Sequence, residues 1–155
     1  MWSTVRLYVR FAVMAILVCA AAVWLPGWLT RVQVPGGYDD LPSLTPFEDY
    51  WLRPGPYAPG HLIVYRFGPA AGDLGFARVA AVAGDLLELR AGKLLVGGTA
   101  CPGWNAAAAL AYPPVGLGPV VVPAGHLFVL SDKHRDDSTV HGLIGAAAVL
   151  GRIRE

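Results

Sequence analysis

The sequence predicts a mainly β domain of antiparallel strands that follows one N-terminal hydrophobic segment. Three observations indicate this: short runs of β-branched and aromatic residues, glycine and proline turns between them, and an unbroken apolar stretch near the N-terminus. The 155 residues suffice for one domain with one appended segment. Apolar residues make up 55% and charged residues 15%, which is more hydrophobic than an ordinary soluble domain. The net charge of +1 gives no electrostatic reason to expect a nucleic-acid partner.

The apolar stretch covers residues 11–29, roughly 19 residues, which is enough to cross about 30 Å of hydrocarbon as a helix. Arg6 and Arg10 precede it, so the positive-inside rule places residues 1–10 in the cytoplasm. Residues 30–155 then form the extracytoplasmic domain. We therefore expect a single-pass protein of the inner (cytoplasmic) membrane, with the lipid bilayer as a partner and the domain on the periplasmic side.

A cleaved secretory signal is the competing interpretation of this stretch. Ala20-Ala21-Ala22 could serve as its cleavage site. However, the apolar run continues beyond that site to Leu29, and the hydrophobic core of a signal is usually shorter. The length of the run favours a retained anchor.

The centre of the predicted domain is the stretch Phe76–Gly98, FARVAAVAGDLLELRAGKLLVGG. Its first half predicts a strand that ends in a tight turn, where Gly84 can adopt a positive φ. A hairpin follows, with Arg90–Lys93 as its turn between two leucine-rich strands. Because these elements leave no room for a helix, we expect this stretch to organise an antiparallel β domain.

Other segments add strands around this centre. Gly60–Phe67 predicts a strand, and the turn in Gly68–Gly75 returns the chain to pair it with the central stretch. Val120–Leu130 contains the next strand, and Ala146–Ile153 predicts a closing strand. Asn105–Leu110 predicts a short helix capped by the asparagine.

The central stretch resembles one protein family. Ala77-Arg78-Val79, small apolar residues and Gly84-Asp85, followed by Gly92-Lys93 in the hairpin, are similar to a block of signal peptidase I and its relatives. The sequence Arg-Val-Ala-Ala-Val is most similar to that of the conjugative-transfer (TraF-type) branch, whose members process pilin subunits. The resemblance implies a signal-peptidase-like antiparallel β domain that acts on leader peptides or pilin precursors.

The segment Ser43-Leu44-Thr45-Pro46 resembles the family's nucleophile motif, Ser-Met-x-Pro. The resemblance implies that Ser43 is the nucleophile, which would need a neighbouring base and a donor for the oxyanion. The following segment, from Tyr50 onwards, resembles the conjugative branch with one residue more than that branch has. This leaves open whether Ser43 or Thr45 faces the site.

The chain departs from the family at the general base. The family's lysine, which accepts the serine proton because burial and neighbours lower its pKa, falls on Ala77. The last block, Ser131–Gly145, keeps Asp132 and Arg135–Ser138, but Val140, His141 and Gly142 stand where Asp, Ser and Arg would support that lysine.

Displaced bases are therefore the hypothesis for an active enzyme. The candidates are Lys133, His134 and His141, with Asp132 as a supporting acid. The histidines and acids lack a recognisable metal-ligand spacing, so we expect neither a metal nor a cofactor. Cys19 and Cys101 lie in different parts of the chain, so no internal disulfide is expected.

Two functions of different class remain open. The first is a membrane-anchored serine endopeptidase that cuts an extended peptide or preprotein substrate. The second is a catalytically inactive homologue that binds peptides, or acts as a scaffold, within a conjugation or secretion assembly. Whether the domain is an enzyme depends on the replacement for the lysine at Ala77.

Overall fold

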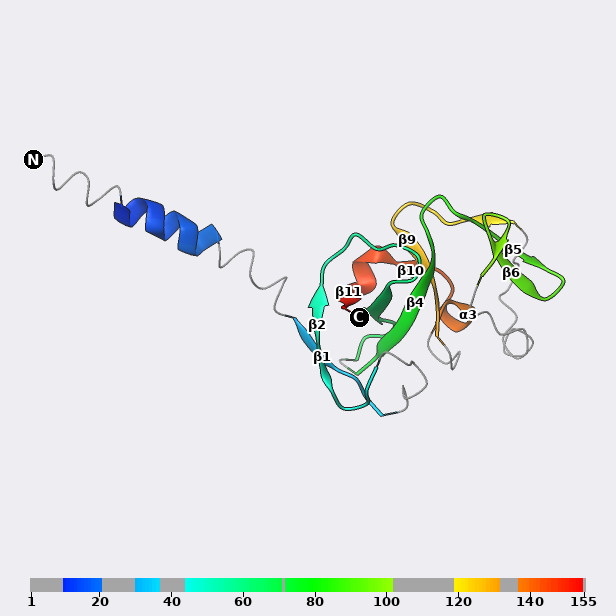
Figure 1. Cartoon of the computed structure of the whole chain (residues 1–155), viewed down its shortest axis with the longest axis horizontal. Helices are drawn as coiled ribbons and strands as arrows, with labels where there is room; N and C mark the ends of the chain where they lie inside the picture. The colour runs from blue at the N-terminus through cyan, green and yellow to red at the C-terminus, as the bar shows by residue number, and fades with distance from the viewer. Residues whose placement is uncertain are drawn as a thin grey trace, which may run out of the picture.

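The structure is a computed structural model that describes residues 10–20, 30–36, 44–70, 72–101, 119–131 and 137–154. Figure 1 shows a mainly β domain with helical residues 10–20 extending away from it. Within the described residues, no helix is both long and apolar enough to span a membrane. Residues 21–29 are not among those described, so the anchor at 11–29 stays a prediction.

The larger of two sheets contains most of the strands. In the described part of the chain it has seven, in the order β1-β2-β11-β3-β4-β9-β10, and every neighbouring pair is antiparallel. The strands are β1 (Arg31–Gln33), β2 (Asp49–Arg53), β11 (Val149–Ile153), β3 (Leu62–Arg66), β4 (Leu74–Val82), β9 (His126–Leu130) and β10 (Ile144–Gly145). The predicted pairing of the Gly60–Phe67 strand with the central stretch is confirmed, since β3 pairs with β4 and places Ile63 opposite Ala77.

The smaller sheet has the order β7-β6-β5-β8. Its strands are β7 (Thr99–Ala100), β6 (Lys93–Val96), β5 (Leu86–Arg90) and β8 (Val120–Val121). The predicted hairpin is confirmed: Arg90 pairs with Lys93, and both turn residues have positive φ, 50° at Ala91 and 74° at Gly92. Gly84 also has the predicted positive φ, 94°.

Two predicted strands are subdivided in the structure. Val120–Leu130 forms β8 in one sheet and β9 in the other, because Pro123 and a turn at Gly125 (φ 74°) separate them. Within Ala146–Ile153, residues Ala146–Ala148 form a 3₁₀ helix before β11 begins. A short helix, α3 (Ser138–His141), was not predicted; Asp137 caps its start, and Gly142 (φ 74°) follows its end.

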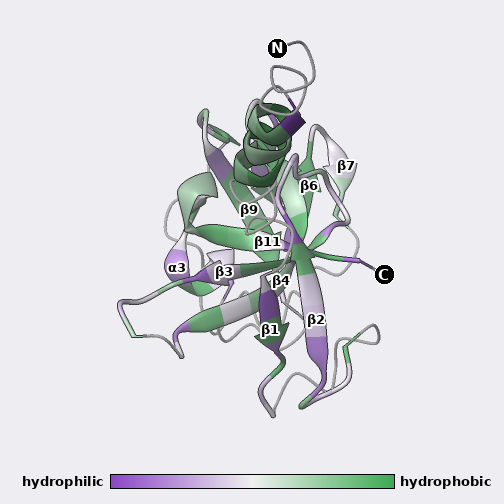
Figure 2. Cartoon of the chain, turned by 90° about the vertical axis from the view of Figure 1, so that its left-hand side faces the viewer, coloured by the Kyte–Doolittle hydropathy of each residue, from purple (hydrophilic) through white to green (hydrophobic). Residues whose placement is uncertain are grey.

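Strand β4 lies at the centre of the core, between apolar clusters on its two faces. Phe76 belongs to a cluster with Val64 and Leu44, whereas Ala77 belongs to the cluster on the other face. A β-bulge between Val79 and Ala81 then reverses the alternation. As a result Ala81 joins a third cluster, which connects the larger sheet to the β5–β6 hairpin. Figure 2 shows the hydrophobic colour along inner strands such as β9 and β11.

Glycines allow close approach at two places in the larger sheet. A Cβ at Gly75 would lie 2.5 Å from the ring of buried Tyr65. A Cβ at Gly151 would lie 2.9 Å from the carbonyl oxygen of Arg53. Gly151 lies at an irregularity in the β11–β3 register. The next residue, Arg152, pairs with Arg53 of the neighbouring strand β2. The missing side chain thus lets β11 bring two arginines together.

Candidate active site

The position of the family's lysine, Ala77, is fully buried in an apolar environment. The residue has 0% exposure, and Ile63 lies opposite it on β3. The fully or nearly fully buried members of its cluster are aliphatic or aromatic: Ile63, Tyr65, Val79, Leu127, Val129 and Ile144. None of these described side chains is a base at neutral pH, so this cluster does not provide a direct replacement for an amine.

The described part of the predicted nucleophile segment packs against β4. Ser43 itself lies outside the described residues. Leu44 is buried at 5% exposure and packs in the same cluster as Phe76, the residue before Ala77. The Thr45 amide donates a hydrogen bond of 2.9 Å to the Tyr50 hydroxyl, which ties this segment to β2. The segment that follows Ser43 therefore contributes to the core cluster on the Phe76 face of β4, opposite the face that carries Ala77.

The last block is organised around the buried carboxylate of Asp137. It accepts hydrogen bonds from the Ser131 amide (2.9 Å) and, at the start of α3, from the amide (2.8 Å) and hydroxyl (2.5 Å) of Thr139. The neighbouring Ser138 hydroxyl accepts a 2.9 Å hydrogen bond from the Val129 amide of β9. Because several donors surround this carboxylate, the cluster fixes α3 against β9.

Of the predicted displaced bases, only His141 is among the described residues. It ends α3, and its ring stacks on Phe67 with centroids 4.8 Å apart and an interplanar angle of 15°. Phe67 packs against the cluster that contains Ala77. The fold therefore brings His141 to the edge of that cluster. Asp132, Lys133 and His134 lie outside the described residues, as does the predicted helix at Asn105–Leu110.

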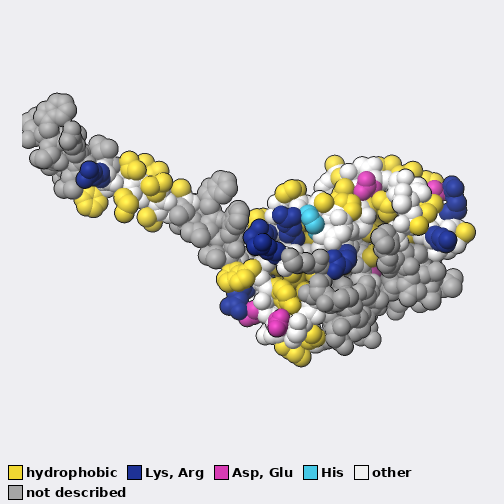
Figure 3. Space-filling model, viewed as in Figure 1, with side chains coloured by type: hydrophobic (Ala, Val, Ile, Leu, Met, Phe, Trp, Pro, Cys, Tyr) yellow, Lys and Arg dark blue, Asp and Glu magenta, His cyan; other side chains and the backbone are white. Residues whose placement is uncertain are grey.

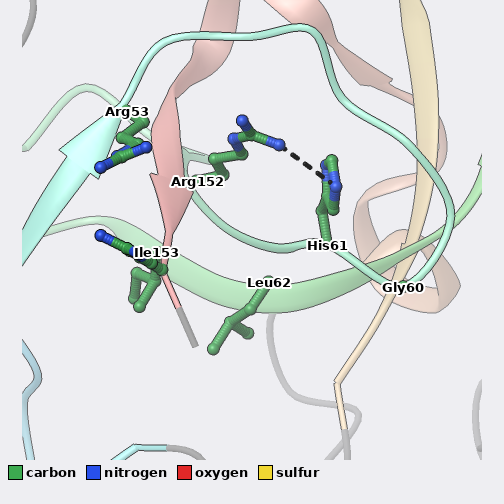
Figure 4. Close-up of a pocket in the computed structure, with 7 residues that line it drawn as sticks. Arg53, Gly60, His61, Leu62, Arg152 and Ile153 are labelled. Atoms are coloured by element: carbon green, nitrogen blue, oxygen red, sulfur yellow. Dashed lines mark hydrogen bonds between the residues drawn. The ribbon is translucent and has the colours of Figure 1, made fainter.

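Sequence reasoning missed a basic pocket of about 300 Å³ at the ends of β2 and β11. Its lining includes Arg53, His61 and Arg152, which Figure 4 labels, and also Arg154. Burial raises the pKa of the nearby Tyr57 phenol, while a hydrogen bond to the Gly55 backbone and the charge of Arg152 act in the opposite direction. Arg53 and His61 are far in sequence from Arg152 and Arg154, and no motif joins the two pairs.

Neither the Cys101 thiol nor the described acidic and histidine side chains provide an alternative centre for chemistry. Cys101 is a half-buried thiol that forms no disulfide, and burial raises its pKa, which makes it a poorer nucleophile at neutral pH. Among the residues that the structure describes, no group of three or more His, Cys, Asp or Glu side chains could hold a metal ion.

Comparison with known proteins gives a clear family match. The family model described as signal peptidase, peptidase S26, matches residues 5–155. A solved structure of a signal peptidase I from Enterococcus faecalis is 22% identical, with a TM-score of 0.46, over 64% of this chain and 98% of that one. No curated protein matched the chain.

Proposed function

Because the chain belongs to the signal peptidase family, peptidase S26, we propose that it is a serine endopeptidase that removes leader peptides from exported polypeptides. In this proposal residues 11–29 anchor it in the inner membrane, and residues 30–155 act on the periplasmic side. The substrate is an extended preprotein segment. The TraF-like sequence of β4 favours pilin precursors of a conjugation system as that substrate.

The observation that supports this proposal is that Leu44 and Phe76 belong to the same buried core cluster. It joins the segment that follows Ser43 to the strand that carries the family's base position. A peptidase of this family needs these two elements side by side, because the serine must transfer its proton to a neighbouring group. The proposal assigns Ser43 as the nucleophile.

The base must then come from outside the Ala77 cluster. We place it in the last block, where His141 stacks on Phe67 at the edge of that cluster. A neutral imidazole can accept the serine proton and return it to the leaving amine. His134 and Lys133, with Asp132 as the supporting acid, are the alternatives from the same block.

Cleavage by the purified full chain in detergent micelles tests the proposal. The substrate is a pilin precursor or another preprotein with small residues before the scissile bond. We expect the parent protein to cut it and Ser43→Ala to be inactive. Loss of the true base, His141→Gln or His134→Gln, should lower kcat by about 10²–10⁴-fold. His126→Gln is the matched histidine control, since His126 contacts the Ala124 carbonyl in a turn. Equal amounts of cleaved product from the parent and from Ser43→Ala would refute the proposal that this protein is a serine endopeptidase.

A second function is favoured by Ala77 itself, whose apolar surroundings contain no described base. In this alternative the chain is an inactive homologue that binds extended peptides for a conjugation or secretion assembly. It predicts that the parent and Ser43→Ala bind such a peptide equally and that neither cuts it. It also predicts a gain of cleavage in Ala77→Lys, whereas a working displaced base predicts no gain.

A further inference from the structure

The basic pocket combines three arginines and one histidine from three strands or their ends. Arg53 ends β2, Arg152 pairs with it on β11, Arg154 follows β11, and His61 precedes β3. No described Asp or Glu lines the pocket. Like charges directly opposite each other on neighbouring strands repel, so this pairing lowers stability unless an anion lies between them.

The hydrogen bonds of His61 also leave a place for an acceptor. The Ala58 amide donates to its Nδ1 over 3.1 Å, so the ring proton belongs on Nε2. Nε2 lies 3.2 Å from Nη1 of Arg152, and a guanidinium has donors only (Figure 4). Two N–H groups thus face each other. With the opposite tautomer, Nε2 accepts from Arg152 and the Ala58 amide loses its acceptor, so in either tautomer one donor has no acceptor among these contacts. A further acceptor at Nε2 and Nη1 allows Nδ1 to keep the Ala58 amide.

The pocket lies close to where the predicted anchor ends. The Thr30 carbonyl accepts a 2.8 Å hydrogen bond from the Leu52 amide, and Arg53 is the next residue. Neighbouring strands are about 4.8 Å apart, so the pocket begins within roughly 10 Å of residue 30. Trp51, 51% exposed, lies on the same strand and beneath the Arg31 guanidinium at 5.3 Å. Figure 3 shows arginine side chains (dark blue) at the end of the domain nearest the N-terminal helix, and a second basic group at the opposite end.

We infer that this pocket binds the phosphate of an anionic phospholipid headgroup. Phosphate oxygens accept forked hydrogen bonds from guanidinium groups, and one oxygen on the pocket side of Nε2 of His61 and Nη1 of Arg152 can accept from both. An exposed tryptophan beside such a pocket is typical of a membrane interface. The choice of a lipid over a soluble phosphate rests on the membrane attachment proposed above, whereas the phosphate chemistry rests on the pocket alone.

The test is a titration of the full chain in uncharged detergent micelles with water-soluble dihexanoyl phosphatidylglycerol. Binding is followed by the ¹⁵N shift of the His61 imidazole and by thermal stability. We expect saturable binding and at least about a tenfold weaker affinity in Arg152→Gln and in Arg53→Gln, as loss of a charged hydrogen bond predicts. Arg90→Gln is the control, because Arg90 pairs with Glu88 in the distant β5–β6 hairpin.

Parallel titrations with inorganic phosphate, dihexanoyl phosphatidylcholine and acetate identify the ligand. Phosphate binding as tight as that of phosphatidylglycerol would overturn the lipid assignment, and equally tight acetate binding would indicate a site for peptide carboxylates. No binding, or equal binding by parent and pocket variants, would overturn the site. Thermal unfolding of each variant separates lost binding from lost folding. Because no substrate is cut in this experiment, it is independent of the peptidase proposal.

Discussion

The Asp137 cluster and the basic pocket are two polar regions built in opposite ways. Asp137 is a fully buried acceptor surrounded by donors from Ser131 and Thr139. The pocket gathers donors around a space that no described carboxylate lines. Buried polar groups with complete partners hold a structure together. In the pocket Arg53 and Arg154 are exposed, and the converging guanidinium groups suit an anion from solution. By this criterion, α3 is a structural support and the end of β11 is a binding site.

The largest expected loss of stability comes from placing a charge in the apolar cluster around Ala77, whose described side chains carry no opposite charge. Ala77→Asp would put a carboxylate into an apolar cluster and should lower the free energy of unfolding by about 3–5 kcal/mol. Urea unfolding measures this. Ala91→Asp is the control, because Ala91 is exposed at the hairpin turn (φ 50°), a conformation that Asp tolerates. Similar losses in both variants would mean that Ala77 is not enclosed by apolar groups.

Removing the acceptor from the complete cluster should have the next largest effect. Asp137→Ala deletes the cap of α3 and leaves the buried Ser131 amide without its partner, at a cost of about 2–3 kcal/mol. Asp49→Ala should cost under about 1 kcal/mol, since the ion pair of Asp49 with Arg31 is exposed. Chemical denaturation of the two variants measures the difference, and a negligible loss in Asp137→Ala would contradict the comparison.

In the basic pocket we expect a substitution to raise the free energy of unfolding, whereas the two substitutions above lower it. Arg53→Gln removes a charge opposite Arg152 and should raise stability by up to about 0.5 kcal/mol in phosphate-free buffer of low ionic strength. Added sodium chloride should abolish the gain by screening. Thermal unfolding at two salt concentrations tests this, and a loss of stability in both buffers would show that Arg53 already has a partner.

The smallest expected effect is on the reactivity of the Cys101 thiol, whose pKa is raised by burial. Its raised pKa means that less thiolate is present at any pH below that pKa than in the unfolded chain. Alkylation by iodoacetamide should therefore be a few-fold slower in the native protein than in urea at pH 8, with the difference persisting as the pH approaches 9. Measurement in Cys19→Ala isolates the Cys101 signal, and equal rates would contradict the burial.

Local patterns were sufficient to predict the central part of the fold. The hairpin turn at Ala91-Gly92 and the glycine turn at Gly84 depend on backbone preferences that a few neighbouring residues determine. The division of Val120–Leu130 between two sheets also has a local signal, Pro123 and Gly125, and so does α3, with Asp137 before it and Gly142 after it. The sequence prediction used neither signal: it placed one strand within Val120–Leu130 and matched the family block from Ser131 onwards.

Other features depend on contacts that sequence spacing does not contain. The bulge between Val79 and Ala81 arises from pairing with β9 and changes which core cluster each following side chain enters. The pocket joins His61 to Arg152, which are 91 positions apart along the chain. For the candidate site, the sequence indicated the family and the departure at Ala77, but the apolar packing around that position required the structure.

The strand that follows the N-terminal segment is itself part of the core. Val32 and Val34 are 8% and 0% exposed, and Thr30 is already bonded to Leu52. Any hinge between the segment and the domain must therefore lie before residue 30. A protease that cut there would release an intact domain, whereas a cut after Val34 would pull two side chains out of the interior. With a bilayer around residues 11–29, β1 would determine how the domain is oriented on the lipid surface.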